Sequence, residues 1–442
     1  MVMASMFQAQ PLLFLPTFSA NDLVWLLLGG VCAFLVSYGL VFAIIRLYRK
    51  FGWVRPVEPG RTPDRTPRLG GVGIYLAFVL ISFLFYLPRS ELNFCSSDNC
   101  ERTSYWLFLL GATLIVAVHA YDDLKPLKPW PKLLAQTLGV LIIMGPFFNG
   151  RFNGVLLFGF SNPFQAAVQH PGLPWYEQNI ISLFIHSPTI TLLAIPAVIF
   201  TWFWMVGMMN AVNWIDGVDG LAGGVVAITG VCMTIICWSL HQYTIAILSA
   251  IFTGAVVGFL PHNWNPAKIF MGDSGAHFLG LGLATLSIIG GAKVALALMV
   301  MGIPILNVAM VIISRVRRHQ SAMQYDATHL HDRLRATGLS ARQICYVFYS
   351  FTAIFGVLAL WFVHLYKLLG IGLVVATMVV LVLWLDYRQQ RGKGPARPAE
   401  RPSEEKRLPD LPETEGPQSY IRPIVSQNAQ PPSHQISIRS DG

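Results

Sequence analysis

Long apolar stretches separated by short polar segments recur along most of the chain. Each stretch has about 17–23 residues, the length that a helix needs to cross the hydrocarbon core of a bilayer. This pattern predicts an all-α polytopic membrane protein with about eleven transmembrane helices. The predicted helices cover residues 23–45, 70–88, 105–120, 132–148, 190–209, 222–239, 243–260, 276–290, 294–314, 344–364 and 368–386.

Positive charges are divided unequally between the two sides of the predicted membrane domain. If the N-terminus lies outside, 26 of the 31 lysines and arginines fall in the loops and the tail on the other side. Because such residues gather in cytoplasmic loops, we expect an external N-terminus and a cytoplasmic C-terminus. The formal net charge of +9 then follows from topology and does not indicate a nucleic-acid partner. Composition agrees, since only 12% of residues are charged, against about 25% in soluble domains.

Three regions follow from this organisation. We expect residues 1–22 to form an external segment, residues 23–386 a transmembrane domain that holds any catalytic site, and residues 387–442 a cytoplasmic tail. The tail is rich in Pro, Glu, Arg, Ser and Gln and has few aromatic residues, a composition typical of disordered segments.

Two external loops carry local patterns. The stretch RFNGVLLFGF at 151–160 is compatible with a small β-hairpin or with an amphipathic surface segment. Cys95 and Cys100 bound a short polar loop, where they form either a disulfide or two free thiols.

Adjacent aspartates end the third predicted helix. Asp122 and Asp123 repel each other unless a cation lies nearby, and Lys125 and Lys128 follow directly. This combination suits metal and phosphate chemistry. A solvated loop turn is the alternative.

A second polar cluster ends the fifth predicted helix, in the sequence NAVNWIDGVDGLAGG. It contains Asn210, Asn213, Asp216 and Asp219. The two aspartates are three residues apart and therefore share a face on a helical turn. The glycines permit close approach of the backbone to a ligand. A polar turn between helices is the alternative, but carboxylates are costly near a bilayer without a function.

A third cluster precedes the eighth predicted helix, in the sequence HNWNPAKIFMGDSGAHFLG. Ser274 is expected to cap the helix, and the free N–H groups at this end are suited to binding a pyrophosphate. Asp273 would hold the Mg²⁺ that neutralises it. Helix capping alone explains Ser274 but not Asp273.

The loop before the tenth predicted helix contains His329, His331 and Arg333. Imidazole and guanidinium groups bind phosphate oxygens well. A zinc site would require more ligands than this spacing provides. All four clusters fall on the predicted cytoplasmic side, so the sequence favours phosphoryl transfer between a nucleotide substrate and a lipid partner.

Five motifs in this order resemble the polyprenyl-phosphate N-acetylhexosamine-1-phosphate transferases, a family of the glycosyltransferase 4 type. The family includes bacterial enzymes that start O-antigen, enterobacterial common antigen and teichoic acid linkage units, and the MurNAc-pentapeptide translocase. The resemblance runs from about Arg61 to Ser340. Its motifs are TPRLGGVGIY, DDLKPLKPWPKLLAQ, NAVNWIDGVDGLAGG, FMGDSGAHFLG and HLHDRLRATGLS.

This resemblance implies transfer of an N-acetylhexosamine 1-phosphate, with GlcNAc-1-phosphate favoured, from a UDP-sugar to undecaprenyl phosphate. UMP is released, and Mg²⁺ is the expected cofactor, with Mn²⁺ as the alternative. The enzyme would lie in the bacterial inner membrane with its active site facing the cytoplasm. A homodimer is left open, and no nucleic acid is expected.

The resemblance also implies roles for single residues. Asp122 would be the base or the group that orients the carrier phosphate, and Asp123 and Asp273 would be metal ligands. Asp216 would lie near the diphosphate, and Asn213 would contact the nucleotide or the metal site. Further catalytic candidates are Lys125, Lys132, His329 and His331. Further substrate-binding candidates are Asn210, Asp219, Gly272, Ser274 and Arg333.

Some positions differ from the family pattern. The stretch His-Leu-His-Asp replaces the three histidines of the translocase, which favours the N-acetylhexosamine branch and leaves the role of Asp332 open. Asn307, Ala276, His119 and Tyr121 also differ from the usual residues, and these differences leave the sugar open. The translocase is the nearest alternative function. A solute transporter is the alternative from another class, but transporters place such carboxylates at the membrane midplane.

Overall fold

The computed structural model describes most of the predicted membrane domain. The described residues are 20–51, 66–89, 100–145, 147–148, 151–152, 155, 194–289, 294–302, 305–306, 330–361 and 366–392. The described residues up to Gln389 form one unit.

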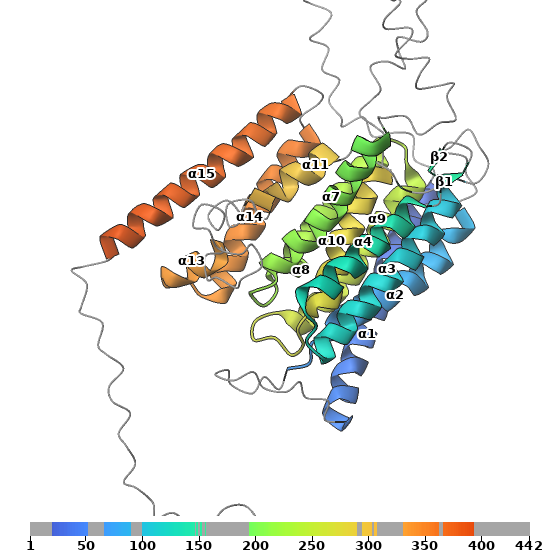
Figure 1. Cartoon of the computed structure of the whole chain (residues 1–442), viewed down its shortest axis with the longest axis horizontal. Helices are drawn as coiled ribbons and strands as arrows, with labels where there is room; N and C mark the ends of the chain where they lie inside the picture. The colour runs from blue at the N-terminus through green and yellow to red at the C-terminus, as the bar shows by residue number, and fades with distance from the viewer. Residues whose placement is uncertain are drawn as a thin grey trace, which may run out of the picture. The chain divides into compact units, whose positions relative to one another are not determined.

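The described part of the chain is almost entirely helical (Figure 1). The first helices are α1 (Ala20–Phe51), α2 (Gly70–Phe85), α3 (Cys100–Leu124), α4 (Pro129–Met144), α7 (Ala194–Ile215) and α8 (Leu221–Ser239). They are followed by α9 (Tyr243–Asn263), α10 (Gly272–Ile289), α11 (Val294–Val300), α13 (Leu330–Ala336), α14 (Ala341–Trp361) and α15 (Tyr366–Gly392). A short 3₁₀ helix, η2, covers Leu87–Arg89.

The prediction of a helical multi-pass membrane protein is confirmed in its general form. Each predicted transmembrane range overlaps one of the described helices, and α13 is an additional short helix. Among the described residues, six helices are long and apolar enough to cross a membrane by length and composition, namely those within α1, α3, α7, α8, α9 and α14. The number of eleven spans and their orientation stay predictions.

Two short strands follow α4. β1 (Phe147–Phe148) pairs antiparallel with β2 (Arg151–Phe152), and Phe148 lies opposite Arg151. Most of the stretch 151–160, where a hairpin or a surface segment was predicted, lies outside the described residues. Helix α15 continues to Gly392, past residue 387, where the tail was expected to begin. Cys95 lies outside the described residues, so its pairing with Cys100 stays untested.

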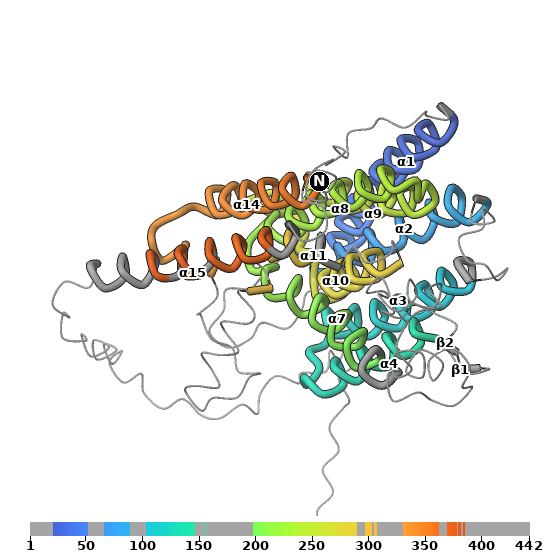
Figure 2. Tube along the Cα trace, turned by 90° about the horizontal axis from the view of Figure 1, so that it is seen from above, coloured from blue at the N-terminus to red at the C-terminus, as the bar shows by residue number. Residues whose placement is uncertain are grey.

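Helix α10 lies between α2, α3, α7 and α9 (Figure 2). Every residue of α10 from Ser274 to Ile288 is buried. Small residues permit this packing, since a Cβ atom on Gly280 would collide with the backbone of Met208 in α7. The buried position of α10 fixes its N-terminus among the ends of the surrounding helices, and Asp273 is in its first turn.

Candidate active site

The N-terminus of α10 meets the C-terminal end of α3 through Asp123. The Oδ1 atom of Asp123 accepts a hydrogen bond from the backbone N–H of Asp273 at 2.8 Å. Its Oδ2 atom accepts bonds from the backbone N–H and the hydroxyl of Ser274 at 3.0 and 2.7 Å. Asp123 is buried, and it satisfies N–H groups that the first turn of a helix leaves unpaired. This capping geometry differs from the metal-ligand role predicted for Asp123.

Gly272 makes this contact between α3 and α10 possible. Its φ angle is +75°, a conformation that side chains other than glycine rarely adopt. A Cβ atom at this position would also collide with the carbonyl oxygen of Arg68 and with the carboxylate of Asp123. Gly272 is therefore required for backbone geometry, and the substrate contact that the family resemblance implied for it stays a prediction.

The segment before α2 holds the same turn from the other side. Phe270 donates its backbone N–H to Pro67 O at 2.8 Å, and Gly70 donates its own to Phe270 O at 3.1 Å. Gly71 donates to Met271 O at 2.9 Å. These bonds give the TPRLGG motif a structural role in positioning Asp273, which the sequence alone did not reveal.

Lys132 joins the two aspartate-bearing helix ends. Its Nζ atom lies 2.6 Å from Asp122 Oδ2 and 2.9 Å from Asp273 Oδ2. The other oxygen of Asp122 accepts the backbone N–H of Leu127 at 2.6 Å, which holds the loop between α3 and α4. One ammonium group thus pairs with two carboxylates that are far apart in the sequence. Lys125, the other lysine candidate, is exposed and lies over the ring of Tyr121.

Asp219 is held by the loop that follows α9. Its Oδ2 atom accepts hydrogen bonds from Asn265 Nδ2 at 2.9 Å and from the backbone N–H of Ala267 at 3.2 Å. The neighbouring Gly220 donates its N–H to Asn263 Oδ1 at 2.9 Å. These contacts join the loop after α7 to the loop that leads to α10.

Asp216 lies outside the candidate membrane spans, directly after α7. Withdrawal of its carboxylate from water raises its pKa well above the ordinary value, and the negative charges of Asp273, Asp123 and Asp219 raise this pKa further. Within the described residues, no cation pairs with Asp216. The Asp216 carboxyl group is therefore held mainly in its neutral form unless a cation binds beside it.

Asp273 shows the opposite shift. Burial acts to raise its pKa, but the charge and the hydrogen bond of Lys132 outweigh burial, so the pKa lies below the ordinary value. Asp273 is therefore a carboxylate at neutral pH.

The short helix α13 brings a histidine to the loop after α7. A Cβ atom on Gly217 would collide with the ring of His331, so the imidazole lies directly against this glycine. Asp332 Oδ1 lies 3.6 Å from His331 Nε2. Arg333 belongs to the same helix, whereas His329 and Asn307 lie outside the described residues.

The two asparagine candidates occupy different positions. Asn210 donates its side-chain amide to Gln136 Oε1 at 3.0 Å and to Val206 O at 2.8 Å, so it points into the helix packing. Asn213 is half-buried one turn later, and its carbonyl accepts the N–H of Asp216 at 3.3 Å. Of the two, Asn213 is closer in sequence to the acidic cluster.

The donor set fits a divalent cation only in part. Within the described residues, no three His, Cys, Asp or Glu side chains are placed to hold a metal ion together. Mg²⁺, however, is commonly bound by one or two carboxylates together with substrate phosphates and water. Asp273, which is ionised, and Asp216, whose ionisation a bound cation would favour, are compatible with such a shared site.

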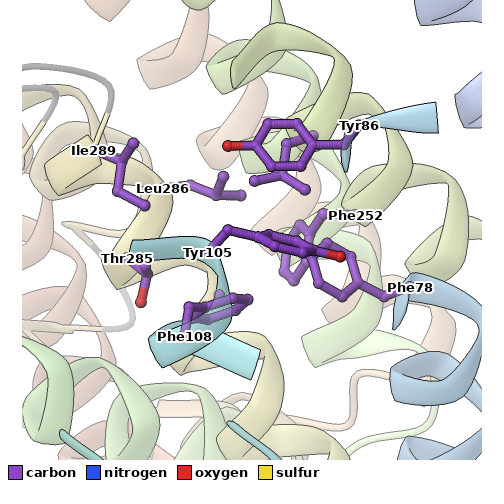
Figure 3. Close-up of a pocket in the computed structure, with 10 residues that line it drawn as sticks. Phe78, Tyr86, Tyr105, Phe108, Phe252, Thr285, Leu286 and Ile289 are labelled. Atoms are coloured by element: carbon purple, nitrogen blue, oxygen red, sulfur yellow. The ribbon is translucent and has the colours of Figure 1, made fainter. Parts of the chain in front are cut away.

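An apolar cavity lies near the ends of α2, α3 and α10 that are opposite to the acidic cluster (Figure 3). It is lined by aromatic residues that include Tyr86 at the end of α2 and Tyr105 near the start of α3. Asp123 and Asp273 lie at the other ends of α3 and α10. The cavity is therefore separate from the acidic cluster.

A family model described as glycosyl transferase family 4 matches residues 105–291. A probable undecaprenyl-phosphate N-acetylglucosaminyl 1-phosphate transferase of Bacillus subtilis (strain 168) is 30% identical over 75% of this chain and 84% of the relative. A decaprenyl-phosphate N-acetylglucosaminephosphotransferase of Mycobacterium leprae is 28% identical over 74% of this chain and 81% of the relative. A phospho-N-acetylmuramoyl-pentapeptide-transferase of Leuconostoc mesenteroides is 33% identical over a shorter match, 55% of this chain and 66% of the relative. The residues that the family model matches include Asp122, Asp216 and Asp273.

Proposed function

Because the chain belongs to glycosyl transferase family 4, we propose that it transfers N-acetylglucosamine 1-phosphate from UDP-GlcNAc to undecaprenyl phosphate and releases UMP. This proposal confines the reaction to the end of the helix bundle where α3, α4, α7 and α10 bring their charged residues together. Its products would be UMP and a lipid-linked diphosphate sugar, the starting unit of an envelope polysaccharide.

One observation carries the proposal: Lys132 spans Asp122 and Asp273 at the N-terminus of α10. A helix N-terminus and an ammonium group favour phosphate oxygens, and flanking carboxylates suit a magnesium-bound diphosphate. The glucosaminyl transferases of Bacillus subtilis and Mycobacterium leprae match about three-quarters of the chain, more than the pentapeptide transferase does. Their substrates are therefore the favoured ones for this chain.

In the proposed reaction, an oxygen of the carrier phosphate forms a bond to the β-phosphorus of UDP-GlcNAc. The bond between that phosphorus and the oxygen that bridges to the α-phosphorus breaks, and its electron pair leaves with UMP. Asp122 orients the carrier phosphate and accepts its proton when it arrives protonated. Lys132 lies beside the same carboxylate, so its ammonium group would contact the carrier phosphate and offset the negative charge that develops there.

Asp273 and Asp216 would hold the Mg²⁺, which when bound offsets negative charge on the diphosphate. Mn²⁺ is the alternative. His331 and Arg333 on α13 would contact the sugar-nucleotide phosphates. We favour direct attack over a phosphorylated aspartate, because a positioned phosphate oxygen can react in line without a covalent intermediate.

We further propose that the enzyme lies in the bacterial cytoplasmic membrane with this site facing the cytoplasm. Arg46, Arg49 and Lys50 end α1, and α1 packs along α9 so that Tyr38 contacts His262 near the end of α9. The basic end of α1 thus lies at the same end of the bundle as the acidic cluster. The positive-inside rule favours this end as the cytoplasmic one.

The test uses full-length purified protein in lipid nanodiscs with undecaprenyl phosphate, MgCl₂ and one UDP-sugar at a time. The donors are UDP-GlcNAc, UDP-GalNAc and UDP-MurNAc-pentapeptide, and the measurement is UMP release together with the lipid product. We expect turnover with UDP-GlcNAc that stops on addition of EDTA and returns with excess MgCl₂. The Asp122→Asn and Asp273→Ala variants should be inactive while retaining the thermal midpoint of a folded protein.

Each alternative has its own result. Product from UDP-MurNAc-pentapeptide and none from UDP-GlcNAc would replace the proposed donor with that of the pentapeptide transferases. Full activity of Asp122→Asn or Asp273→Ala would remove these residues from the reaction. Absence of UMP release with every donor would reject the transferase function.

A further inference from the structure

A layer of polar side chains lies beneath the acidic cluster, about one helical turn deeper in the bundle. Each of the helices α3, α4, α7 and α10 contributes one member. They are His119, Gln136, Asn210 and His277. Of these, His119, Gln136 and His277 are buried, with exposed fractions of 0%, 3% and 1%. The proposed chemistry uses none of these three buried residues.

Two imidazole rings are in direct contact at the centre of this layer. The ring centroids of His119 and His277 are 3.8 Å apart, and the ring planes are inclined by 30°. His277 Nδ1 lies 2.6 Å from the carbonyl oxygen of Asp273, one turn earlier in α10. Because that oxygen can only accept, His277 Nδ1 donates. The stacked pair thus links α3 to the turn of α10 that contains Asp273.

The His119 ring is also held from its edges. His119 Nδ1 lies 2.8 Å from Ile115 O and therefore donates to it, which leaves Nε2 as an acceptor. Gln136 Nε2 lies 3.5 Å from this acceptor, and Gln136 Oε1 accepts from Asn210 Nδ2 at 3.0 Å. The hydrogen bonds run in one direction: Asn210 of α7 donates to Gln136 of α4, which donates to His119 of α3. The orientation of the His119 ring is therefore determined by three helices.

The position of this pair relates it to the acidic cluster above. His119 lies three residues before Asp122, and His277 lies four residues after Asp273. On a helix, residues three or four apart lie on the same face. The contact between the two rings is therefore stacked beneath the contact that Lys132 makes between the two aspartates.

We propose that His119 and His277 are positioning residues for sugar-phosphate transfer. Their contact sets the spacing between the last turn of α3 and the first turn of α10, which Lys132 spans. This inference rests on the proposed function. A purely structural role predicts that activity recovers together with stability when both members of a buried hydrogen-bonded pair are replaced. Such a double replacement by apolar groups of similar shape can be nearly neutral for stability.

The test measures kcat, the KM for each substrate and the thermal midpoint of the full-length protein in nanodiscs. The variants are His119→Phe, His277→Phe and the double variant His119→Phe with Gln136→Leu. Phenylalanine keeps a ring at each position but removes its hydrogen bonds. We expect kcat to fall about tenfold, the size of effect that supporting partners of reactive groups commonly have, while both KM values stay within about twofold of the wild type.

The double variant separates positioning from stability. Gln136→Leu removes the amide that His119→Phe leaves without its acceptor, although Asn210 then keeps only its bond to Val206 O. The thermal midpoint should therefore recover in part while kcat stays low. Return of kcat together with the midpoint, or wild-type kcat in both single variants, would overturn the proposal. Tyr105→Phe is the matched control, because it removes a buried hydrogen bond to Ser82 at 2.8 Å at the opposite end of the bundle. An equal loss of kcat in this control would also overturn the proposal.

A spectroscopic measurement tests the contact between His119 and His277 independently of turnover. In ¹⁵N-histidine solid-state NMR spectra, we expect the His119 signals of a neutral ring protonated at Nδ1, identified by their absence in His119→Phe. These signals should shift in His277→Phe, and unchanged signals would contradict the contact. If the wild type releases no UMP from any donor, the proposed function fails while these spectra still decide whether the pair exists.

Discussion

The Oδ2 atom of Asp123 accepts two hydrogen bonds from Ser274, one from its backbone N–H at 3.0 Å and one from its hydroxyl at 2.7 Å. The two residues are 151 positions apart in the sequence. Ser274 was expected to cap α10 with its own hydroxyl, but the cap is supplied by a carboxylate from another helix. The second aspartate of the pair therefore secures the helix end on which Asp273 is carried.

Removing this cap should affect both folding and turnover. In Asp123→Asn, an amide N–H₂ group replaces a carboxylate oxygen opposite backbone N–H donors, so at least one hydrogen bond is lost. We expect the free energy of unfolding to fall by about 1–3 kcal/mol, the usual cost of leaving a buried donor without its acceptor, and turnover to fall with it. Thermal denaturation of the purified protein and UMP release measure the two effects.

Asp273→Asn is the contrasting variant for this prediction. The Asp273 carboxylate is not among the groups that cap α10, so this variant should lose turnover with a smaller change in thermal midpoint. If Asp123→Asn were as stable as the wild type, the capping role would be wrong.

The apolar pattern was sufficient to predict where the helices lie, because a bilayer requires long uninterrupted apolar stretches. Placing the acidic motifs at one end also followed from the sequence, since each motif stood at the end of a predicted helix. The alternation of spans then brings such ends to the same side. Asp122 and Asp273 accordingly lie within reach of one lysine.

Contacts between side chains of distant helices could not be predicted in the same way. No local pattern indicates that Asp123 caps α10 or that the TPRLGG segment pairs with residues 270–271, since both depend on how helices pack. No local pattern distinguishes His277, which lies in an apolar helix. His119 was noticed only as a departure from the family pattern, and a partner for it appears only in the folded chain.

Lys132 should be more sensitive to substitution than any lysine outside the cluster. Lys132→Met removes the only ammonium group that the described residues place between Asp122 and Asp273. The two carboxylates would then repel each other, and the phosphate would lose a charged donor. We expect kcat to fall by about a hundredfold or more, the scale of losing one electrostatic donor at a reacting centre.

Lys50→Gln is the matched control for Lys132. Lys50 lies exposed at the end of α1 with its ammonium over the ring of Phe51, and its loss should leave kcat close to the wild-type value. Lys132→Arg should retain part of the activity, because charge is kept while the geometry changes. Wild-type kinetics for Lys132→Met would show that the bridge has no part in transfer.

Gly272→Ala should abolish activity through the backbone. The residue has a φ angle of +75°, and an added Cβ atom would collide with Arg68 O and the Asp123 carboxylate. The turn before α10 must then change shape, which displaces Asp273. We expect UMP release below detection and a lower thermal midpoint, whereas Gly207→Ala in α7 should be tolerated because its Cβ atom would meet no atom within 4 Å. Equal behaviour of the two variants would contradict the assigned role of Gly272.

The contact between Gly217 and His331 gives a prediction about the sugar nucleotide. A Cβ atom on Gly217 would collide with the His331 imidazole, so Gly217→Ala must move that side chain. Because Gly217 is exposed and lies in a loop, the fold should survive with an unchanged thermal midpoint. If His331 contacts the sugar-nucleotide phosphates, the KM for UDP-GlcNAc should rise by about tenfold, the equivalent of one hydrogen bond of about 1.4 kcal/mol, while the KM for undecaprenyl phosphate stays the same. Gly39→Ala in α1, where a Cβ atom would meet nothing within 4 Å, is the control. A rise confined to the KM for the lipid would instead assign His331 to the carrier.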